Sequence, residues 1–441
     1  MSTLEPDLER LLREAQADRL PSVSAAVAQR GEPVWAGAVG LADAEDARAA
    51  TPDTQYRIGS ITKTFTAVAL MQLVERGEAD LDDPLERHLP ETRSASTLRR
   101  MLSHLSGLQR EPEGEMWETL VPPTADELLA QLARTEPVLP PHVGHHYSNV
   151  AFGVLGLVVA RHAERPYRAV VDERILRPLG LERTTWEPAA PFAHGYSVDP
   201  YADVVRREAQ LDLGGAEAAG QLWSTTGDLC RWATVLADGH PDVLRAEAVE
   251  AMWYPQAMFD PETWTLGWGL GLMLYRDGDR VFAGHGGAMP GHLAGIVVDR
   301  RSKVAAAALT NAGSRADPER LALRLAQATI AARPDPAKEW RPQPAPPPEL
   351  ESALGRWWTE GAELLFLWED GRLVSRAPAA KRPVQPSVFE PLGDDRFRTA
   401  SGREQGELLR LVRNEAGTVV RMYWATYPLT RAPELFGTPA A

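Results

Sequence analysis

The sequence predicts a mixed α and β fold (α/β, of the α+β kind) in which helices flank an antiparallel sheet, with an inserted all-helical subdomain and a small C-terminal antiparallel β-barrel. Three observations predict this fold class. Strand patterns near the start of the chain are separated from later ones by a mostly helical stretch at about 78–215. A proline-rich segment interrupts the chain at 333–348. Short strand patterns alternate with turns after it, and 441 residues accommodate more than one domain.

The chain begins with a helix, a hairpin and a second helix. Residues 4–18 place leucines on one face at helical spacing, and the turn GEP then separates SAAVAQR from VWAGAVG. From Ser60, apolar residues recur at helical spacing until Gly77, which suits the left-handed end of a helix. Ser60 and Lys63 are therefore expected to share one helix start.

The inserted stretch and the strands after it carry further signals. Thr124 and Glu127 match a capping box before LLAQLA. The apolar run at 150–160 is too short to cross a bilayer and predicts a buried helix. Strand patterns resume in GWGLGLMLYR and in HLAGIVVDRRSKVAAAALTN, and Asp317 followed by Pro318 predicts the start of a last helix.

A linker and a small β domain are expected at the C-terminal end. Seven prolines between residues 333 and 348 predict a stiff, extended spacer. The turns EDG and GDD in the stretch 349–441 separate short strand patterns, which predicts a small antiparallel barrel. The predicted domains are therefore 1–332 and 349–441, joined by the linker at 333–348.

Composition restricts the classes of partner and the compartment. The net charge of −14 argues against nucleic acid and anionic membranes, whose phosphates it would repel. The single cysteine, Cys230, excludes an intrachain disulfide and a Cys-rich zinc site, and is expected to be a small buried side chain. The N-terminal stretch has no basic segment followed by an apolar one, so we expect no signal peptide and a cytoplasmic location.

Lys63 is chemically unusual in this chain. Of 47 basic residues only four are lysines, and unlike arginine a buried lysine can lose its proton. Ser60 is expected in the first helical turn, where backbone N–H groups favour an anion, with Lys63 one turn later on the same face. Burial and the positive helix end favour a neutral amine, so the two residues form a candidate nucleophile and base. Ser-x-x-Lys is, however, a short pattern that also arises by chance.

Two further segments carry candidate chemistry. In HHYSNVAFGVLG, Tyr147 and Asn149 would point the same way on an extended backbone, where a phenol can pass protons and an amide can hold a lysine and a substrate. Taken alone, the pair is better explained as the start of a helix. The glycines of GHGGAMPGH, at 284–292, allow a backbone N–H to face an oxyanion, although such a segment is more often a simple turn.

The three motifs Ser-x-x-Lys, Tyr-x-Asn and His-Gly-Gly occur in this order along the chain. Together they resemble the active-site serine family of class C β-lactamases, DD-peptidases and related esterases. The resemblance covers nearly all of residues 8–332, and LSHLSGL at 102–108 and AGQLWSTTGDLCRW at 219–232 also look like that family. It implies a β-lactamase/transpeptidase-like serine catalytic domain.

The resemblance also implies a role for each motif residue. Ser60 would attack a carbonyl, Lys63 and Tyr147 would exchange its proton, and Asn149 would position Lys63 and the substrate amide. His285 would take the place of the lysine or histidine of the third motif.

The third motif would lie along the substrate. The oxyanion hole would come from the backbone N–H groups of Ser60 and Ala288, with Gly286 and Gly287 beside the substrate. Gly286 stands where the family commonly has Ser or Thr, whose hydroxyl helps to hold a substrate carboxylate. This departure leaves recognition of β-lactams open, so a weak β-lactamase and a DD-carboxypeptidase-like enzyme stay among the alternatives.

The expected substrate is a small molecule or a peptide, and no cofactor is expected. With no export signal expected, the resemblance points to cytosolic members: esterases, D-amino-acid-specific peptidases and penicillin-binding-protein-type thioesterases. The last group resembles this chain in carrying a lipocalin-like barrel. It implies a peptidyl thioester, such as one on a carrier protein, whose last residue is D and whose own amine closes a macrocycle. The alternatives are a hydrolase that uses water and a non-catalytic homologue that binds D-residue peptides.

Two further residues are candidates for substrate binding. Trp223, with Trp264 and Trp268, would line an apolar pocket or pack in a core. Arg431, near the end of a strand, would reach a substrate carbonyl or carboxylate, or form an ordinary surface or interdomain ion pair. No His-Glu-x-x-His motif accompanies the histidines, so no metal site is expected.

Overall fold

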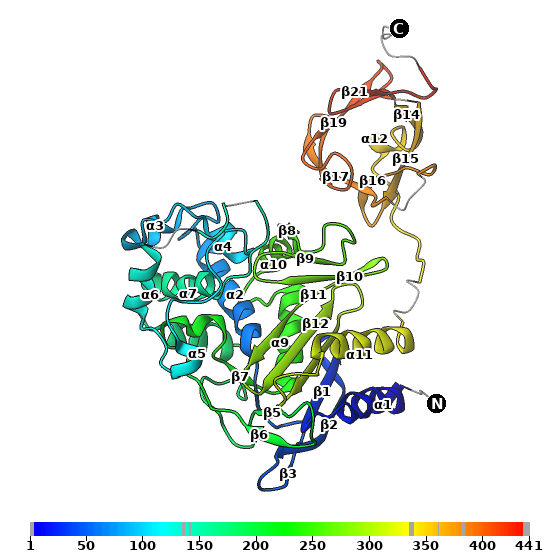
Figure 1. The fold of residues 1–441 in the computed structure, drawn as a ribbon. Helices are drawn as coiled ribbons and strands as arrows, with labels where there is room; N and C mark the ends of the chain where they lie inside the picture. Colours follow the sequence, from blue (N-terminus) through cyan, green and yellow to red (C-terminus); the bar gives the residue numbers. More distant parts are fainter. Residues whose placement is uncertain are drawn as a thin grey trace. The chain divides into compact units, whose positions relative to one another are not determined.

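A computed structural model describes residues 4–134, 137–140, 143–334, 339–359, 361–380 and 384–434. The chain divides into two compact units, Met1–Asp335 and Pro336–Ala441. The larger unit contains a nine-stranded sheet with helices on both faces, and the smaller contains an eight-stranded sheet (Figure 1).

The nine-stranded sheet of the larger unit is antiparallel throughout. Its order is β3-β2-β1-β13-β12-β11-β10-β9-β8, so the N-terminal hairpin pairs with the last strand of the unit. This confirms the predicted sheet and its early hairpin. The strands are β1 (Ser22–Gln29), β2 (Glu32–Asp43), β3 (Arg48–Ala49), β8 (Ala257–Met258), β9 (Leu266–Trp268), β10 (Met273–Asp277), β11 (Arg280–Met289), β12 (His292–Asp299) and β13 (Val304–Thr310).

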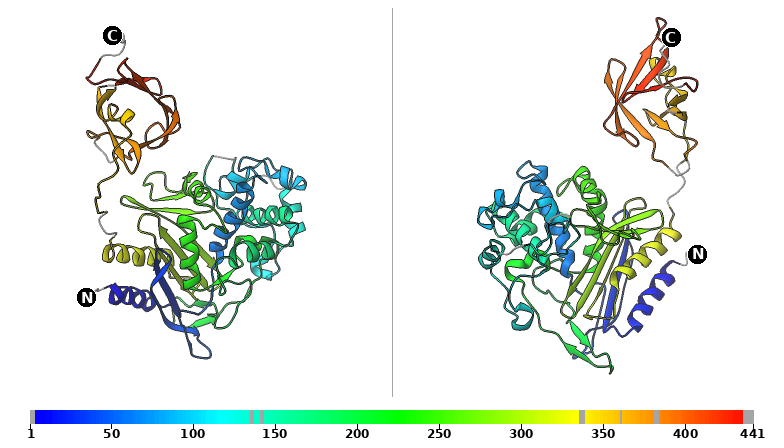
Figure 2. Two further views of the ribbon diagram at one scale, coloured as in Figure 1. Left: turned by 180° about the vertical axis from the view of Figure 1, so that it is seen from behind. Right: turned by 45° about the horizontal axis from the view of Figure 1, so that its top comes forward.

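Helices cover both faces of this sheet. On one face α1 (Leu4–Ala17) and α11 (Pro318–Ala332) lie side by side (Figure 2, right). On the other face α9 (Thr226–Asp238) packs on the central strands. Because both faces are covered, β13 is a run of small apolar residues buried along its whole length.

The segment between β4 (Tyr56–Arg57) and β7 (Trp223–Ser224), which pair with each other, is mostly helical as predicted for 78–215. It is not all-helical, because the short strands β5 (Tyr196–Val198) and β6 (Val205–Arg207) pair within it. Helix α6 (Ala125–Leu132) begins with the predicted capping box of Thr124 and Glu127, and α7 (Asn149–Ala163) contains the apolar run predicted to be a buried helix. The remaining elements of the unit are η1 (Gly59–Ile61), α2 (Thr62–Glu75), α3 (Leu85–His88), η2 (Pro90–Thr92), α4 (Leu98–Leu102), α5 (Met116–Thr119), α8 (Tyr167–Val171), η3 (Asp172–Leu176), η4 (Gly214–Ala219) and α10 (Ala246–Trp253).

The smaller unit is a nearly closed antiparallel barrel, as predicted. Its strands follow one another in chain order, and a bridge between Trp358 and Thr430 joins the first strand to the end of the last. Large apolar side chains, including Trp357 and Phe366, fill its interior. The elements are α12 (Pro348–Glu351), β14 (Gly355–Thr359), β15 (Ala362–Glu369), β16 (Arg372–Arg376), β17 (Ser387–Gly393), β18 (Arg396–Ser401), β19 (Leu408–Arg413), β20 (Val419–Trp424) and β21 (Tyr427–Leu429).

The glycine-rich third motif is a strand and not a turn, which corrects the sequence interpretation. Residues 284–289 belong to β11, and the chain turns at Pro290 and Gly291. The glycines are explained by close packing, since a Cβ on Gly284 would lie 1.8 Å from the carbonyl oxygen of Ile296 on β12. Glycine within a strand often marks such a close approach of backbone.

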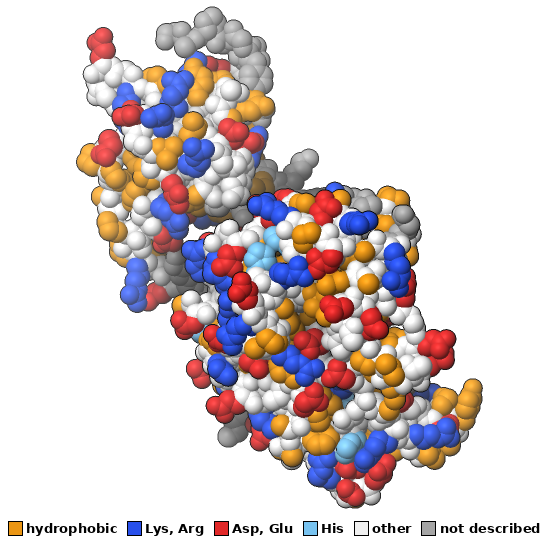
Figure 3. All heavy atoms as spheres, turned by 90° about the vertical axis from the view of Figure 1, so that its left-hand side faces the viewer, with side chains coloured by type: hydrophobic (Ala, Val, Ile, Leu, Met, Phe, Trp, Pro, Cys, Tyr) orange, Lys and Arg blue, Asp and Glu red, His pale blue; other side chains and the backbone are white. Residues whose placement is uncertain are grey.

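The protein surface seen in Figure 3 is mixed in charge and polarity. Acidic, basic and apolar side chains are interspersed on the face drawn in Figure 3. Within the described ranges, no helix combines the length and apolarity needed to span a membrane. Cys230 is buried, as predicted, with its Sγ 3.4 Å from the carbonyl oxygen of Ala26.

We expect the helix that begins beside Ser60 to depend on Trp232 for its stability. The Trp232 ring is fully buried, stacks on Phe65 of α2 at 4.0 Å between centroids, and donates to Thr64 Oγ1 at 2.7 Å. Trp232→Ala should therefore lower the free energy of unfolding by about 3–5 kcal/mol. Trp340→Ala, at a site 82% exposed, is the matched control, and equal shifts in denaturant midpoint for both variants would contradict the expectation.

Candidate active site

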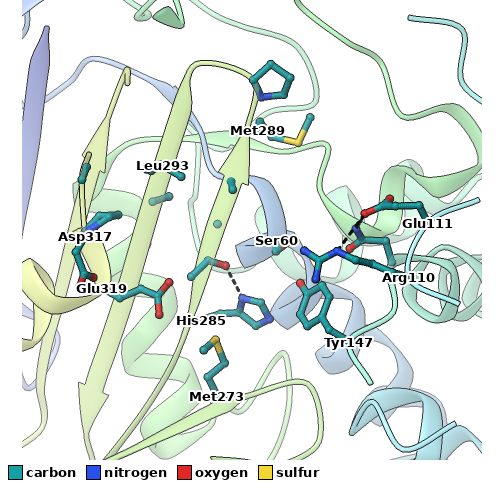
Figure 4. A pocket seen from close by; sticks show the side chains of 18 of the residues that line it. Ser60, Arg110, Glu111, Tyr147, Met273, His285, Met289, Leu293, Asp317 and Glu319 are labelled. Carbon is teal, nitrogen blue, oxygen red and sulfur yellow. Dashed lines mark hydrogen bonds and ion pairs between the residues drawn. The ribbon is translucent and has the colours of Figure 1, made fainter. Parts of the chain in front are cut away.

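A pocket of about 540 Å³ beside β11 collects most of the predicted site residues (Figure 4). Seven of them line it: Ser60, Tyr147, Asn149, His285, Gly286, Gly287 and Ala288. Lys63 lies behind Ser60, to which it is hydrogen bonded. Neither Trp223 nor Arg431 is among the residues that line the pocket.

Ser60 and Lys63 make direct contact at the start of α2. Ser60 lies in the short 3₁₀ turn η1, and Lys63 Nζ is 3.0 Å from Ser60 Oγ and 2.7 Å from the carbonyl oxygen of Ala219. The Lys63 side chain is fully buried, and burial lowers its pKa well below the ordinary value, against the opposing charge of Glu111. The amine is therefore biased toward the neutral form, which can accept the Ser60 proton.

Two glycines hold this serine turn against β11. Gly59 has φ +48°, and a Cβ there would lie 2.7 Å from both the backbone nitrogen and the carbonyl oxygen of Ala288. A Cβ on Gly287 would lie 1.9 Å from the carbonyl oxygen of Ile58. Any side chain at either position would push the turn off the strand, so the glycines bring Ser60 and Ala288 together.

Tyr147 faces the serine and the side chains of Lys63 and Arg110. Its ring centroid lies 5.0 Å from Lys63 Nζ and 5.0 Å from the guanidinium carbon of Arg110. Burial raises the pKa of Tyr147, while interactions with Ser60 and Arg110 oppose the rise. The phenol consequently keeps its proton at neutral pH and can donate it.

Asn149 is positioned by a carboxylate that the sequence analysis did not single out. Ser148 caps α7 by accepting from the backbone N–H of Ala151, and Asn149, the first residue of the helix, donates from Nδ2 to Glu111 Oε1 at 2.6 Å. Burial raises the pKa of Glu111, while Asn149, Arg110 and Lys63 oppose the rise. One sequence signal could have found Glu111, since it follows closely after LSHLSGL.

The imidazole of His285 is neutral, and its contacts indicate its tautomer. Nδ1 lies against the carbonyl oxygen of Gly286, which can only accept, so Nδ1 carries the proton. Burial, with a smaller effect of the Lys63 charge, lowers the pKa of His285 to about 3. The remaining lone pair is on Nε2, which has no hydrogen-bond partner among the described residues.

His104 is a second residue that the sequence analysis did not assign a role. It lies in the LSHLSGL segment, its ring stacks on Tyr147 at 4.3 Å between centroids, and its Nδ1 accepts from the backbone N–H of Ser148 at 3.0 Å. Burial, followed by the Lys63 charge, lowers its pKa well below the usual range. His104 therefore acts as a neutral support for the Tyr147 segment.

Trp223 and Arg431 lie elsewhere. Trp223 is buried, with its ring edge-on to those of Phe192 and His292, whereas Trp268 does line the pocket. The Arg431 guanidinium stays within the smaller unit, where it lies 3.8 Å above the Trp357 ring centroid. Its donors serve carbonyl groups of that unit: Ser352, Leu354 and Arg356.

A comparison with known protein families shows which family the chain belongs to. The family model "Beta-lactamase" matches residues 8–330, about three quarters of the chain. The chain belongs to the β-lactamase family. A second family model, "Domain of unknown function (DUF7586)", matches residues 346–431, the barrel of this β-lactamase-family chain.

Three similar proteins extend the comparison. The chain is 30% identical to Esterase EstB of Burkholderia gladioli over 312 residues, covering 61% of this chain and 78% of the esterase. The crystal structure of SurE covers 97% of this chain and 98% of its own, with a TM-score of 0.62 and 26% identity. A D-stereospecific amidohydrolase from Streptomyces sp. covers 76% of this chain and 99% of its own, with a TM-score of 0.64 and 29% identity. The chain spans about half the length of the first curated relatives it matches.

The contact between Ser60 and Lys63 leads to a test of the lysine as a base. A guanidinium cannot lose its proton, so Lys63→Arg should slow the modification of Ser60 by a fluorophosphonate about 10²- to 10⁴-fold, as followed by mass spectrometry. The wild-type rate should fall as the pH falls through the lowered pKa of Lys63, because only the neutral amine accepts a proton.

Lys303→Arg is the matched control for this substitution. Lys303 lies in the turn between β12 and β13 and forms an ion pair with Asp238. An arginine at this position can form the same ion pair. The modification rate of this variant should equal that of the wild type. A Lys63→Arg variant that reacts as fast as Lys303→Arg would show that Lys63 is not the base.

Proposed function

We propose that this chain is a serine acyl-enzyme catalyst, in which Ser60 is acylated by an ester, thioester or amide whose acyl residue has the D configuration. The observation that carries the proposal is the contact of 3.0 Å between Ser60 Oγ and the buried Nζ of Lys63, at a pocket beside β11. A serine beside a lysine that is biased toward the neutral form is an activated nucleophile with its base.

The proposed acylation step uses three side chains and two backbone groups. Ser60 Oγ attacks the carbonyl carbon and gives its proton to Lys63 Nζ, while the oxyanion accepts from the backbone N–H groups of Ser60 and Ala288. As the tetrahedral intermediate collapses, Tyr147 donates its phenolic proton to the leaving group and is reprotonated from Lys63. Serine thus becomes an ester, and the leaving group departs with the proton that Ser60 lost.

Deacylation reverses the same proton path. The acceptor loses its proton to Tyr147 and Lys63 as it attacks the acyl-enzyme, and Ser60 regains a proton as it leaves. Asn149, held by Glu111, offers its amide beside the nucleophile. His285 is neutral in this scheme and contributes a lone pair and no charge.

The walls of the pocket suit an apolar peptide substrate. Trp117, Trp268, Met273, Met289 and Leu293 supply apolar surface around Ser60. The similarity to a D-stereospecific amidohydrolase over 76% of this chain supports a D-configured acyl residue. The similarity to Esterase EstB supports esters as acyl donors.

Our more specific proposal is that the acceptor is the peptide's own amine. The chain would then release a nonribosomal peptide from a carrier-protein thioester by head-to-tail macrocyclisation. Support comes from the layout that the chain shares with penicillin-binding-protein-type thioesterases, a serine domain followed by a barrel, and from its similarity to SurE along both units. The alternatives are a hydrolase with water as the acceptor and, without catalysis, a peptide-binding homologue.

A peptidyl thioester distinguishes these outcomes. We expect the full chain to convert a short peptidyl thioester ending in D-Leu, and not its L-Leu counterpart, into a product one water lighter than the free acid. Ser60→Ala is the control, because it removes the nucleophile while Lys63 remains.

Mass spectrometry of the products gives the answer. Linear acid alone, formed only when Ser60 is present, would replace the cyclase with a hydrolase. Absence of both product and acyl-enzyme would leave the non-catalytic homologue.

A further inference from the structure

The wall of the pocket contains a carboxylate in the space that a side chain at Gly286 would need. A Cβ on Gly286 would lie 1.8 Å from Glu319 Oε1 and 2.4 Å from Glu319 Cδ. Gly286 is paired with Gly295 across β11 and β12, and a Cβ on Gly295 would lie 2.5 Å from the backbone nitrogen of Glu319. Gly295 thus lets the start of α11 settle on the sheet, and the lack of a side chain at Gly286 leaves room for the Glu319 carboxylate at the pocket (Figure 4).

The position of this carboxylate is fixed by a neighbouring hydroxyl. Tyr275 of β10 donates from its hydroxyl to Glu319 Oε2 at 2.7 Å. Glu319 is also the second residue of α11, whose N-terminus favours a negative charge. Burial raises the pKa of Glu319, the hydrogen bond from Tyr275 opposes the rise, and the neighbouring charge of Asp317 adds a smaller rise.

The strand relates Glu319 to the reacting carbonyl. Gly286 precedes Ala288 by two residues on β11, a distance of about 7 Å along the strand. Consider a substrate extended along β11 with its reacting carbonyl at the Ala288 N–H. Its leaving group, on the far side of the scissile bond, would then lie near the Glu319 carboxylate.

The pocket has few positive charges that could balance a substrate carboxylate beside Glu319. Among its described lining residues the acidic ones are Glu111, Asp317 and Glu319, and the only Lys or Arg is Arg110. Arg110 lies over the Tyr147 ring, and its Nε is 3.6 Å from Glu111 Oε1. A substrate carboxylate near Glu319 would therefore meet a like charge, whereas an amide N–H or a cation would find an acceptor.

We propose that Glu319 is a specificity-determining residue that rejects substrates with a free carboxylate beside the scissile bond and selects those with a neutral or cationic group there. This inference rests on the proposed acyl-enzyme chemistry of Ser60. It assigns a substrate class to the site: amides, carboxamide-terminated thioesters and esters with a cationic leaving group.

Three thioesters of N-acetyl-D-leucine test the proposal with the full chain. Their thiol leaving groups are mercaptoacetate, mercaptoacetamide and thiocholine, which are anionic, neutral and cationic. Release of thiol gives kcat/KM for each, and a ratio of two such values is independent of the fraction of folded enzyme. The wild type should prefer the neutral to the anionic thioester by roughly 10- to 100-fold.

Glu319→Gln should bring this preference close to one, because it removes the charge and leaves an amide of the same shape. Glu319→Ala, the second variant, should change the ratio in the same direction. Asp317→Asn is the matched control, since it removes an equal charge from an exposed lining side chain that can still cap α11. Solvent screening should limit its effect to about threefold.

The possible failures are distinguishable. If Ser60-dependent turnover continues and neither Glu319 variant changes the ratio, Glu319 does not set specificity and the proposed function stands. If Asp317→Asn changes the ratio as much as Glu319→Gln, the preference reflects the overall charge of the pocket and the proposal is wrong. If Ser60→Ala releases thiol as fast as the wild type, both the proposed function and this inference fall.

Discussion

The site depends on one packing constraint, the contact between the turn at Gly59 and the backbone of Ala288. This contact sets a helix start against the middle of a sheet, so Ser60 lies at the pocket while Lys63, one turn further on, is buried. The bias of the lysine toward its neutral form follows from that burial, because a buried ammonium is costly unless it is fully compensated. The close backbone packing that Gly59 allows thus buries Lys63, and this burial lowers the pKa of the base beside the proposed nucleophile.

The aromatic surroundings act in the same direction on several groups. The rings of His104, Tyr147, Trp268 and His285 form a connected cluster, with contacting pairs 4.3–6.4 Å apart between centroids. Burial in this cluster lowers the pKa values of both imidazoles and raises that of the phenol, so His104 and His285 are neutral and Tyr147 keeps its proton. A proton that Lys63 accepts therefore meets no second positive charge on these rings. A buried polar group without a hydrogen-bond partner lowers the stability of the fold, and functional sites commonly contain such groups.

The sequence was most informative where the relation between residues is local. Ser60 and Lys63 are three positions apart on one helix, and the capping box of α6 and the aspartate cap of α11 are equally local, so each could be predicted from spacing. The strand β11 was missed because glycine has little intrinsic preference for strands, and only the approach of β12 and α11 explains it there. No local pattern could relate Glu319 to Gly286 or Trp223 to His292, since both relations arise from tertiary packing.

The pairing of β1 with β13 has a consequence for how the protein is made. Ala26 of β1 lies opposite Ala307 of β13. The early strand β1 can therefore pair with β13 only after nearly the whole unit has been synthesised. The helical segment lies between these two strands in the sequence. Contacts between residues so far apart in the sequence slow folding, because the entropy of closing the long loop is lost before the strand pairing stabilises the fold. The pocket borders β11, which joins β1 only through β12 and β13, so a nascent chain that stops before β13 carries the Ser60 segment without a completed sheet beside it.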